Sequence, residues 1–400
     1  MVSLNFVFIF ALVIVGINLL PVIFPSLLVH EFGNIYTDRY EKFEIGNNAI
    51  LLILSGMVIF SIGFLYKKNK ILGLSSIINK IRNFEFSKKH SLIIGVIILA
   101  IYAGITSPEL SLDESEQYAD YDIVLNGIET FPITDSGDRT YDEQNSRFVR
   151  MILLIFSYDY FDNVKIIPFI FSIILVTISG LVAAQISNRR IAGILTMIVL
   201  LQAHTFLEYD TIAVYENFWT CFFLLSIYTI QKRWYLSGIF YILSVFSKAF
   251  ATPFLILNVY YVLRNDSKRS TKLKILASYG VVILFMLILF AIGNTIYDDI
   301  IHIDFNRFLI GFSHFSSQLQ FDIFLLIMIL PVSVGLFFTA RNGIKNAESL
   351  LFFIPVLLLF GPLVGLVTDY FVTLPYRFVP LIVFFSISFS VVLFRNIKSS

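Results

Sequence analysis

The sequence predicts an all-α polytopic membrane protein with about 12 membrane segments and both termini in the cytoplasm. Apolar and aromatic residues make up 57% of the 400-residue chain, and charged residues only 14%. A soluble domain carries about 25% charged residues, so this chain has too little polar surface to face water on all sides. Its mean hydropathy is +0.82. The apolar runs are long and unbroken, which excludes the alternating strands of a membrane β-barrel.

Apolar windows mark the predicted spans, since a helix needs about 20 residues to cross a hydrocarbon core of roughly 30 Å. They cover residues 4–29, 49–66, 91–107, 165–186, 191–207, 211–230, 275–296, 323–340, 349–367 and 378–394, with the ambiguous stretch 235–263 in addition. The first window lacks the basic start and the small-residue cleavage site of a signal peptide, so we expect it to remain as a span.

Basic residues indicate which loops face the cytoplasm, because Lys and Arg are enriched on that side. The segment 67–90 holds seven of them, the segment 264–274 holds five, and four short links carry pairs. All these loops share one side only if residues 235–263 enter and leave the membrane as a hairpin. A single span there would place the basic segment 264–274 outside, so the hairpin is the prediction.

The predicted hairpin turns near Lys248. Residues 235–247 extend only about 20 Å as a helix, so Lys248 is expected within the membrane slab and open to the outside. Thr252 and Pro253 have the pattern of an N-cap followed by proline at the first helical position, which predicts the start of the second helix there. A lysine inside a membrane is costly and is a candidate for anion binding. Snorkelling to the surface is the alternative.

The segment 108–163 is the one long polar stretch, with 13 acidic residues against three arginines. A loop of this length is usually functional or disordered. The pattern predicts one helix from Asp113 to Gly127, ended by the glycine. It predicts a second, amphipathic helix from Glu143 to Tyr158 in the membrane interface. The apolar face of that second helix consists of Phe148, Met151, Ile152 and Ile155.

Two adjacent carboxylates, Asp113 and Glu114, follow the third predicted span closely. A carboxylate at the mouth of a membrane cavity can act as general base toward an acceptor hydroxyl or amine. Adjacent helical residues do not point the same way, so we expect the two to have separate roles. Asp-Glu pairs are also common in ordinary loops, and that interpretation stays open.

Four groups of residues follow one another in a characteristic order. They are Asp113-Glu114 through Gly127, Phe206-Leu207-Glu208-Tyr209 followed by Glu216, Leu236-Ser237-Gly238 through Ser247-Lys248 and Pro253, and Tyr376-Arg377-Phe378-Val379-Pro380. This order resembles the C-type glycosyltransferase superfamily, which includes the protein O-mannosyltransferases and the aminoarabinose transferases of lipid A. The resemblance covers residues 91–263 well and residues 264–400 loosely.

Two features depart from the family pattern. The acidic loop follows the third predicted span rather than the first, so residues 1–90 form an added N-terminal two-helix extension with a basic cytoplasmic loop. The family often carries an arginine two residues after the tyrosine that matches Tyr209. Here Asp210 and Thr211 follow that tyrosine, which leaves the phosphate contact open. The predicted domains are therefore this extension, a transferase-like module over 91–263, and variable C-terminal segments over 264–400.

The resemblance implies an integral membrane glycosyltransferase that acts on the extracytoplasmic side with inversion at the sugar carbon. Its donor would be a sugar on a polyprenyl phosphate such as dolichyl phosphate, and its acceptor a glycan, lipid or protein. Asp113 would be the general base, and Glu114 would orient the acceptor or Asp113. The expected substrate-binding residues are Lys248, Glu216, Tyr209, Tyr118 and Arg377. An ion pair of Glu216 with Lys248, an interfacial anchor at Arg377 and an aromatic belt at the tyrosines are the alternatives.

No cofactor is expected, although the cluster Asp298, Asp299, His302 and Asp304 offers the oxygen ligands of a divalent cation. The sequence shows no glycine-rich phosphate loop, zinc spacing or basic outer stripe, so no nucleic acid is expected. Membrane lipids are expected partners, in the cell membrane rather than an internal one. A secondary transporter with broken helices remains an alternative, although repeated halves are not found. A non-catalytic assembly subunit is a third hypothesis.

Overall fold

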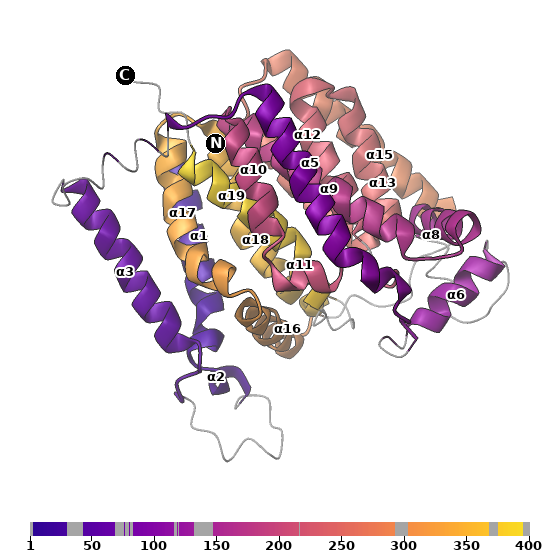
Figure 1. The fold of residues 1–400 in the computed structure, drawn as a ribbon, viewed down its shortest axis with the longest axis horizontal. Coiled ribbons are helices and arrows are strands. Elements are labelled where there is room, and N and C mark those ends of the chain that lie inside the picture. Colours follow the sequence, from indigo (N-terminus) through magenta and orange to yellow (C-terminus); the bar gives the residue numbers. More distant parts are fainter. Residues whose placement is uncertain are drawn as a thin grey trace.

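A computed structural model describes residues 3–29, 43–68, 76, 80, 83–115, 118, 120–131, 147–215, 217–292, 303–367 and 375–394. Every regular element in these ranges is a helix (Figure 1). Six stretches are long and apolar enough to cross a membrane. They are α1 (Leu4–Ile23), α5 with the turn after it (Lys88–Ser111), α9 (Ile166–Ser187), α17 (Ile323–Arg341), α18 (Lys345–Val367) and α19 with the turn before it (Pro375–Leu393). The predicted all-helical membrane class is confirmed.

The remaining helices fill out the bundle or lie on its ends. They are α2 (Ser26–Val29), α3 (Ala49–Lys67), α6 (Tyr121–Thr130), α8 (Phe148–Phe161), α10 (Arg190–Leu200), α11 (His204–Glu208), α12 (Phe218–Lys232), α13 (Tyr235–Ser247), α14 (Leu255–Arg264), α15 (Arg269–Ile292) and α16 (Phe305–Ser317). The apolar runs 191–207 and 211–230 are thus not continuous helices. Between the end of α10 and the start of α12 the chain forms only the short helix α11 and an irregular loop.

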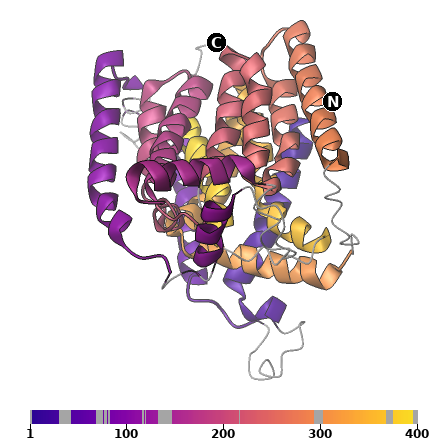
Figure 2. The same ribbon diagram turned by 90° about the vertical axis from the view of Figure 1, so that its right-hand side faces the viewer.

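The bundle has two ends, and we name them by their residues. The links at Arg189, Arg264 and Lys345 form the basic end, at the top of Figure 1. The other end, here called the loop end, carries α6, α8, α11 and α16. Figure 2 shows α8 and α16 lying across the bundle rather than along it.

The first helix is part of the core rather than an appendage. Val7, Ala11 and Val15 of α1 are at most 2% exposed, and α1 packs against α16, α17 and α18. Ser316 of α16 donates a hydrogen bond to Asn18 of α1 (Oγ to Oδ1, 3.0 Å). A polar bond of this kind helps to join helices in an apolar solvent. α3 contributes little to this core and stands at the edge of the molecule (Figure 1).

Residues 235–263 form two helices with a break between them, as predicted. Ser226 of α12 accepts at its carbonyl from Ser237 (2.7 Å) and at its hydroxyl from Asn258 (2.8 Å). Because Ser237 of α13 and Asn258 of α14 reach the same residue, the chain turns back between them and both helices pack against α12. The Tyr241 hydroxyl closes the turn by donating to the Thr252 carbonyl (2.6 Å).

The descending helix starts later than the sequence predicts. A 3₁₀ turn, η4 (Ala249–Phe254), contains Thr252 and Pro253, and α14 begins at Leu255 with Phe254 as its N-cap. The Thr252 hydroxyl caps no helix here. The Tyr241 hydroxyl binds the Thr252 carbonyl instead, which fixes the tighter turn.

The predicted helix from Asp113 to Gly127 is wrong. Residues 112–115 form no helix, and α6 begins at Tyr121 and runs through Gly127 to Thr130. The reason is a long-range contact: the Glu114 carboxylate accepts a hydrogen bond from the N–H of Ala213 (2.7 Å). That bond pulls the segment out of line with α6.

The second helix of this loop, α8, runs from Phe148 to Phe161, and of the predicted apolar face Met151 is buried in the protein. Its buried residues are Arg150, Met151, Leu154 and Ser157. Ile152, assigned to the apolar face from the sequence, is 53% exposed. The buried face packs on α6, α9 and α13, so protein contacts set its rotation.

Two glycines let α9 and α10 approach closely. A Cβ on Gly193 would lie 2.6 Å from the Gly180 carbonyl oxygen, which is backbone and cannot move aside. Gly104 of α5, by contrast, has nothing within 4 Å of a Cβ position.

We therefore expect Gly193→Ala to destabilise the protein by about 1–3 kcal/mol, because the added methyl group separates the two helices. Gly104→Ala is the matched control and should leave the melting temperature unchanged or higher. Thermal unfolding followed by circular dichroism in detergent checks both variants. Equal melting temperatures for the two would contradict the close packing.

Candidate functional site

A second hydrophobic cluster, separate from the main core, lies at the loop end. It joins α6, α8, the start of α9, the irregular loop before α12, and Tyr376. Met151 and Leu154 of α8 and Phe218 of α12 are fully buried in it. Segments that are far apart in the sequence therefore pack together at this end.

Four tyrosines from three segments form what we call the tyrosine cluster. The ring of Tyr215 stacks on that of Tyr376, with centroids 4.1 Å apart. Tyr118 contacts Tyr215 edge-on at 5.0 Å, and Tyr209 lies 5.7 Å from Tyr215. The sequence pointed to Tyr118 and Tyr209, and the structure brings them together through two tyrosines that it did not single out.

Two cations flank Tyr376. The Lys248 Nζ lies 4.4 Å from the centroid of the Tyr376 ring, and the Lys248 residue is only 5% exposed. The Arg377 guanidinium lies 4.3 Å from the ring centroid of Phe250, in the hairpin turn. An aromatic face attracts a cation electrostatically, so both side chains are held in place. Lys248 from the hairpin and Arg377 from the C-terminal segment thus reach one place.

The Arg377 guanidinium keeps hydrogen-bonding capacity. Its Nε donates to the Tyr376 hydroxyl (3.3 Å), whereas its buried Nη1 has no hydrogen-bond partner among the described residues. A buried donor without a partner is costly. This arrangement suits an arginine that receives an anionic ligand, because a guanidinium can bind a phosphate through two nitrogens.

Glu114 is a positioning residue in this geometry. Its side chain is 1% exposed, and burial raises its pKa. Besides the bond from Ala213, the neighbouring Val214 carbonyl accepts from the Arg150 guanidinium (3.2 Å). Glu114 and Arg150 together hold the backbone that carries Tyr215. Sequence analysis missed Arg150, since one arginine in an acidic loop carries no signal of its partner.

Asp113 points the other way and is exposed. Its Oδ1 accepts from the N–H of Ser115 (2.9 Å), which lowers its pKa together with the charge of Lys165. The Lys165 ammonium donates to the carbonyls of Glu109 and Leu112 (2.8 and 2.9 Å). Lys165, also missed from the sequence, therefore fixes the turn that precedes Asp113. Asp113 and Glu114 have separate environments, one exposed and one buried, although the charge of Lys165 acts on both.

Several predicted residues lie outside the described part of the chain. They are Glu216 and, in the candidate cation cluster, Asp298, Asp299 and His302. The fourth member of that cluster, Asp304, accepts from the N–H of Asn306 (2.9 Å) at the start of α16. Among the residues that the structure describes, no group of three acidic, His or Cys side chains is placed to hold a metal.

Asp210, the residue after Tyr209, is buried. Its Oδ2 accepts from the Tyr102 hydroxyl of α5 (2.6 Å), and its backbone carbonyl accepts from Ser172 of α9 (2.7 Å). Burial, with the charge of Glu109, raises its pKa to about 7. Asp210 thus ties the irregular loop to two helices.

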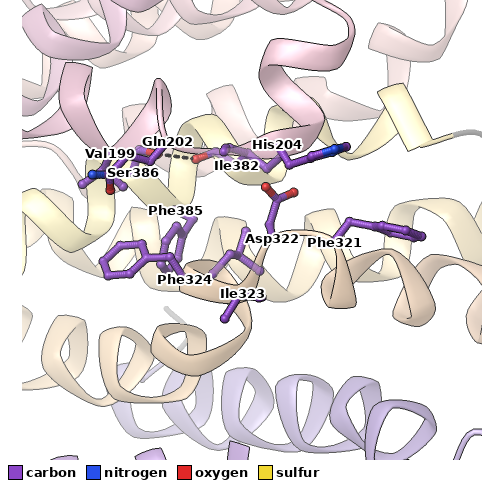
Figure 3. Close-up of a pocket in the computed structure, with 12 residues that line it drawn as sticks. Val199, Gln202, His204, Phe321, Asp322, Ile323, Phe324, Ile382, Phe385 and Ser386 are labelled. Atoms are coloured by element: carbon purple, nitrogen blue, oxygen red, sulfur yellow. Dashed lines mark hydrogen bonds between the residues drawn. The ribbon is translucent and has the colours of Figure 1, made fainter. Parts of the chain in front are cut away.

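A cavity of about 220 Å³ lies nearby, between α10, α17 and α19. Figure 3 shows the Asp322 carboxylate pointing from the start of α17 toward the segment that carries His204. The Thr205 hydroxyl donates to Asp322 Oδ2 (2.7 Å). This contact joins α11 to α17, while Oδ1 of Asp322 has no hydrogen-bond partner among the described residues.

No protein-family model, curated protein or solved structure matches the chain. Arguments about function therefore depend on the residues and contacts described above.

The raised pKa of Asp210 predicts how stability depends on pH. Its ordinary pKa is 3.8 and its folded pKa about 7, so between these values the folded protein holds a proton that the unfolded chain has released. The free energy of unfolding should therefore fall as pH rises through this window. Asp210→Asn keeps an acceptor for Tyr102 and has no proton to release.

We expect the melting temperature of the natural protein to fall between pH 5 and pH 8 more steeply than that of Asp210→Asn. Melting curves in detergent at the two pH values give the comparison. Parallel pH dependences would show that Asp210 titrates as an ordinary surface carboxylate.

Proposed function

We propose that the protein is an integral membrane glycosyltransferase that moves a sugar from a polyprenyl-phosphate donor to an acceptor on the extracytoplasmic side. The observation that supports this proposal is the meeting of Lys248 and Arg377 around Tyr376, beside the hairpin turn. The proposed topology has about 12 membrane segments with both termini cytoplasmic, so the loop end faces outward. The acceptor is a glycan, lipid or protein.

The departing group of such a reaction is a lipid phosphate that gains negative charge. Cations held in a place with little water stabilise that charge far better than water-exposed ones do. Lys248 is almost fully buried, and the buried Nη1 of Arg377 has no hydrogen-bond partner within the described part of the chain. The tyrosine cluster next to them offers aromatic faces and hydroxyls for the sugar ring.

The reaction exchanges one bond at the anomeric carbon for another. The acceptor oxygen attacks that carbon, its proton passes to a carboxylate, and the bond to the phosphate oxygen breaks with the electron pair left on the phosphate. Asp113 is the proposed base because it is exposed to an acceptor arriving from water, with its lowered pKa keeping it ionised. Glu114 acts through the backbone at Ala213.

The broken helix pair α13 and α14 also fits a secondary transporter, in which interrupted helices form the substrate site. The two functions differ in what they do to a sugar. A transferase forms a new glycosidic bond on one side of the membrane, whereas a transporter moves an unchanged sugar across it. Sealed vesicles that are assayed for both product and uptake separate them.

Lys248→Met should weaken the binding of polyprenyl phosphate about tenfold or more, because a charge-assisted contact to the phosphate is lost. Lys232→Met is the matched control. Lys232 also lies over a tyrosine ring, Tyr228, at 4.6 Å, but at the basic end. Native mass spectrometry with a short-chain polyprenyl phosphate measures the affinities. An unchanged affinity for Lys248→Met would mean that this lysine serves only the packing of Tyr376.

Asp113→Asn should abolish sugar transfer, by about 100-fold or more, while polyprenyl phosphate still binds. The assay uses proteoliposomes with a panel of polyprenyl-phosphate-linked sugars and an extract of surface glycans as acceptor. Asp162→Asn is the control, since Asp162 is an exposed carboxylate of the same loop in a left-handed conformation (φ 52°) that asparagine tolerates. Full transfer by Asp113→Asn would remove Asp113 as the base.

A further inference from the structure

The basic end holds the largest of the described cavities, far from the tyrosine cluster along the helices. Its volume is about 520 Å³, within the range of small-molecule sites. Four links that meet at this end line it: the ends of α9 and α12, the segment after α14, and the turn between α17 and α18. The proposed function does not use this cavity.

Carboxamide side chains dominate the lining. They are Gln185, Asn188, Gln231, Asn265, Asn342 and Asn346. Three of these amides have a buried polar atom without a hydrogen-bond partner in the described structure: Gln185 Oε1, Asn265 Nδ2 and Asn346 Oδ1. Native proteins leave few such atoms, and each one in a cavity wall suggests a missing ligand.

Of these three unpaired atoms, Nδ2 of Asn265 has the best-defined orientation. It is 2% exposed, and its Oδ1 accepts from the N–H of Ser267 (2.7 Å), which fixes the orientation of the amide. Its Nδ2 is therefore a true orphan donor in the wall. The orphan oxygens of Gln185 and Asn346 are acceptors, so a ligand must both accept and donate hydrogen bonds.

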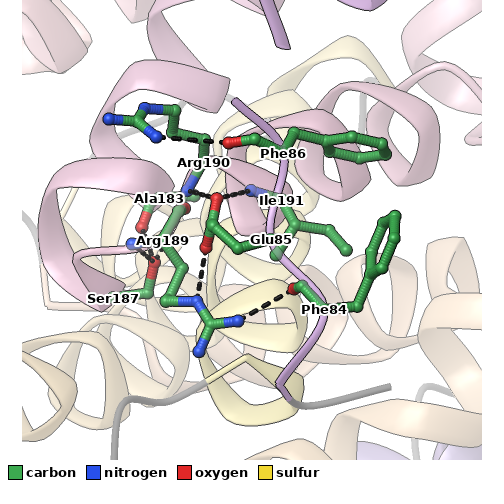
Figure 4. A network of polar contacts seen from close by, with 8 residues as sticks. All are labelled: Phe84, Glu85, Phe86, Ala183, Ser187, Arg189, Arg190 and Ile191. Carbon is green, nitrogen blue, oxygen red and sulfur yellow. Dashed lines mark hydrogen bonds and ion pairs between the residues drawn. The ribbon is translucent and has the colours of Figure 1, made fainter. Parts of the chain in front are cut away.

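Asp266 and Lys345 are the charged residues in the lining of this cavity, and they pair with each other, which argues against an ionic ligand. Glu85 pairs with Arg189 and accepts from the N–H groups of Arg190 and Ile191 (2.9 and 3.3 Å), as Figure 4 shows. Two further pairs, at 2.6 Å each, join Arg264 to Glu348 and Lys345 to Asp266. Lys345 and Asp266 line the mouth of the cavity, and both side chains are exposed.

The lining also argues against a flat aromatic ligand. No aromatic side chain lines the cavity within the described ranges, whereas a base or ring is normally stacked on one. Hydroxyl groups suit the wall best, because each one can rotate, donate to an amide oxygen and accept from an amide nitrogen.

We propose that this cavity binds an uncharged, polyhydroxylated group: a free polyol or sugar, or the polyol headgroup of a lipid. In the proposed topology the cavity faces the cytoplasm. Asn265 and Gln185 provide the donor and an acceptor for its hydroxyls.

The test uses the purified full-length protein in a detergent without a sugar headgroup, because glucoside or maltoside detergents would compete. Saturation-transfer NMR measures the binding of free myo-inositol and glucose. Native mass spectrometry from nanodiscs compares phosphatidylinositol and phosphatidylglycerol with phosphatidylserine, which is anionic but has no polyol. Binding of the free polyols identifies a soluble ligand, and selective retention of the two polyol lipids identifies a headgroup.

Gln185→Leu and Asn265→Asp should each weaken the bound species about tenfold, the effect of one lost hydrogen bond to a buried group. Gln202→Leu, an exposed amide at the loop end, should leave binding unchanged. If Asn265→Asp does not fold, the half-buried Gln185 carries the test alone. The proposal is overturned if no polyol binds, if phosphatidylserine is retained equally, or if Gln185→Leu binds as the natural protein does.

Discussion

Backbone groups inside a bilayer find no water, so every interruption of a helix must be satisfied by the protein itself. The structure meets this constraint at two places on the loop end. In the hairpin turn the Thr252 carbonyl is bound by the Tyr241 hydroxyl, and in the loop before α12 the N–H of Ala213 is bound by Glu114. Both interruptions face the tyrosine cluster. Irregular backbone therefore occurs where side chains from distant segments can support it, and these supports position the candidate site.

The features that the sequence could predict are those with a local or a summed signal. Apolar composition predicts the helical membrane class, and the distribution of Lys and Arg predicts a break within residues 235–263, because a single crossing there would reverse every later loop. The structure has this break between α13 and α14. The helix from Asp113 to Gly127 failed for the opposite reason. Helical propensity there is overridden by the bond from Glu114 to Ala213, a partner that lies far along the chain and carries no pattern of its own.

In the candidate site, too, some residues could be predicted from the sequence and their contacts could not. Lys248 and Arg377 could be selected singly, since a charged residue in an apolar context is unusual. Their meeting around Tyr376 could not, because it depends on how the C-terminal segment packs against the hairpin turn. Tyr215 and Lys165 gave no signal at all. Tyrosines and lysines near helix ends are ordinary in membrane proteins, and only their contacts distinguish them.

The cations at the two ends of the molecule have different surroundings, and the ligands proposed for the two ends differ accordingly. At the basic end Arg189, Arg264 and Lys345 each pair with a carboxylate. The charged residues in the cavity lining, Lys345 and Asp266, pair with each other, so neutral amides define the cavity. At the loop end Lys248 and Arg377 lie over aromatic rings. A ring holds a cation without cancelling its charge. The proposed lipid phosphate belongs to the loop end, where Nη1 of Arg377 has no hydrogen-bond partner among the described residues, and the proposed polyol belongs to the amide-lined cavity of the basic end.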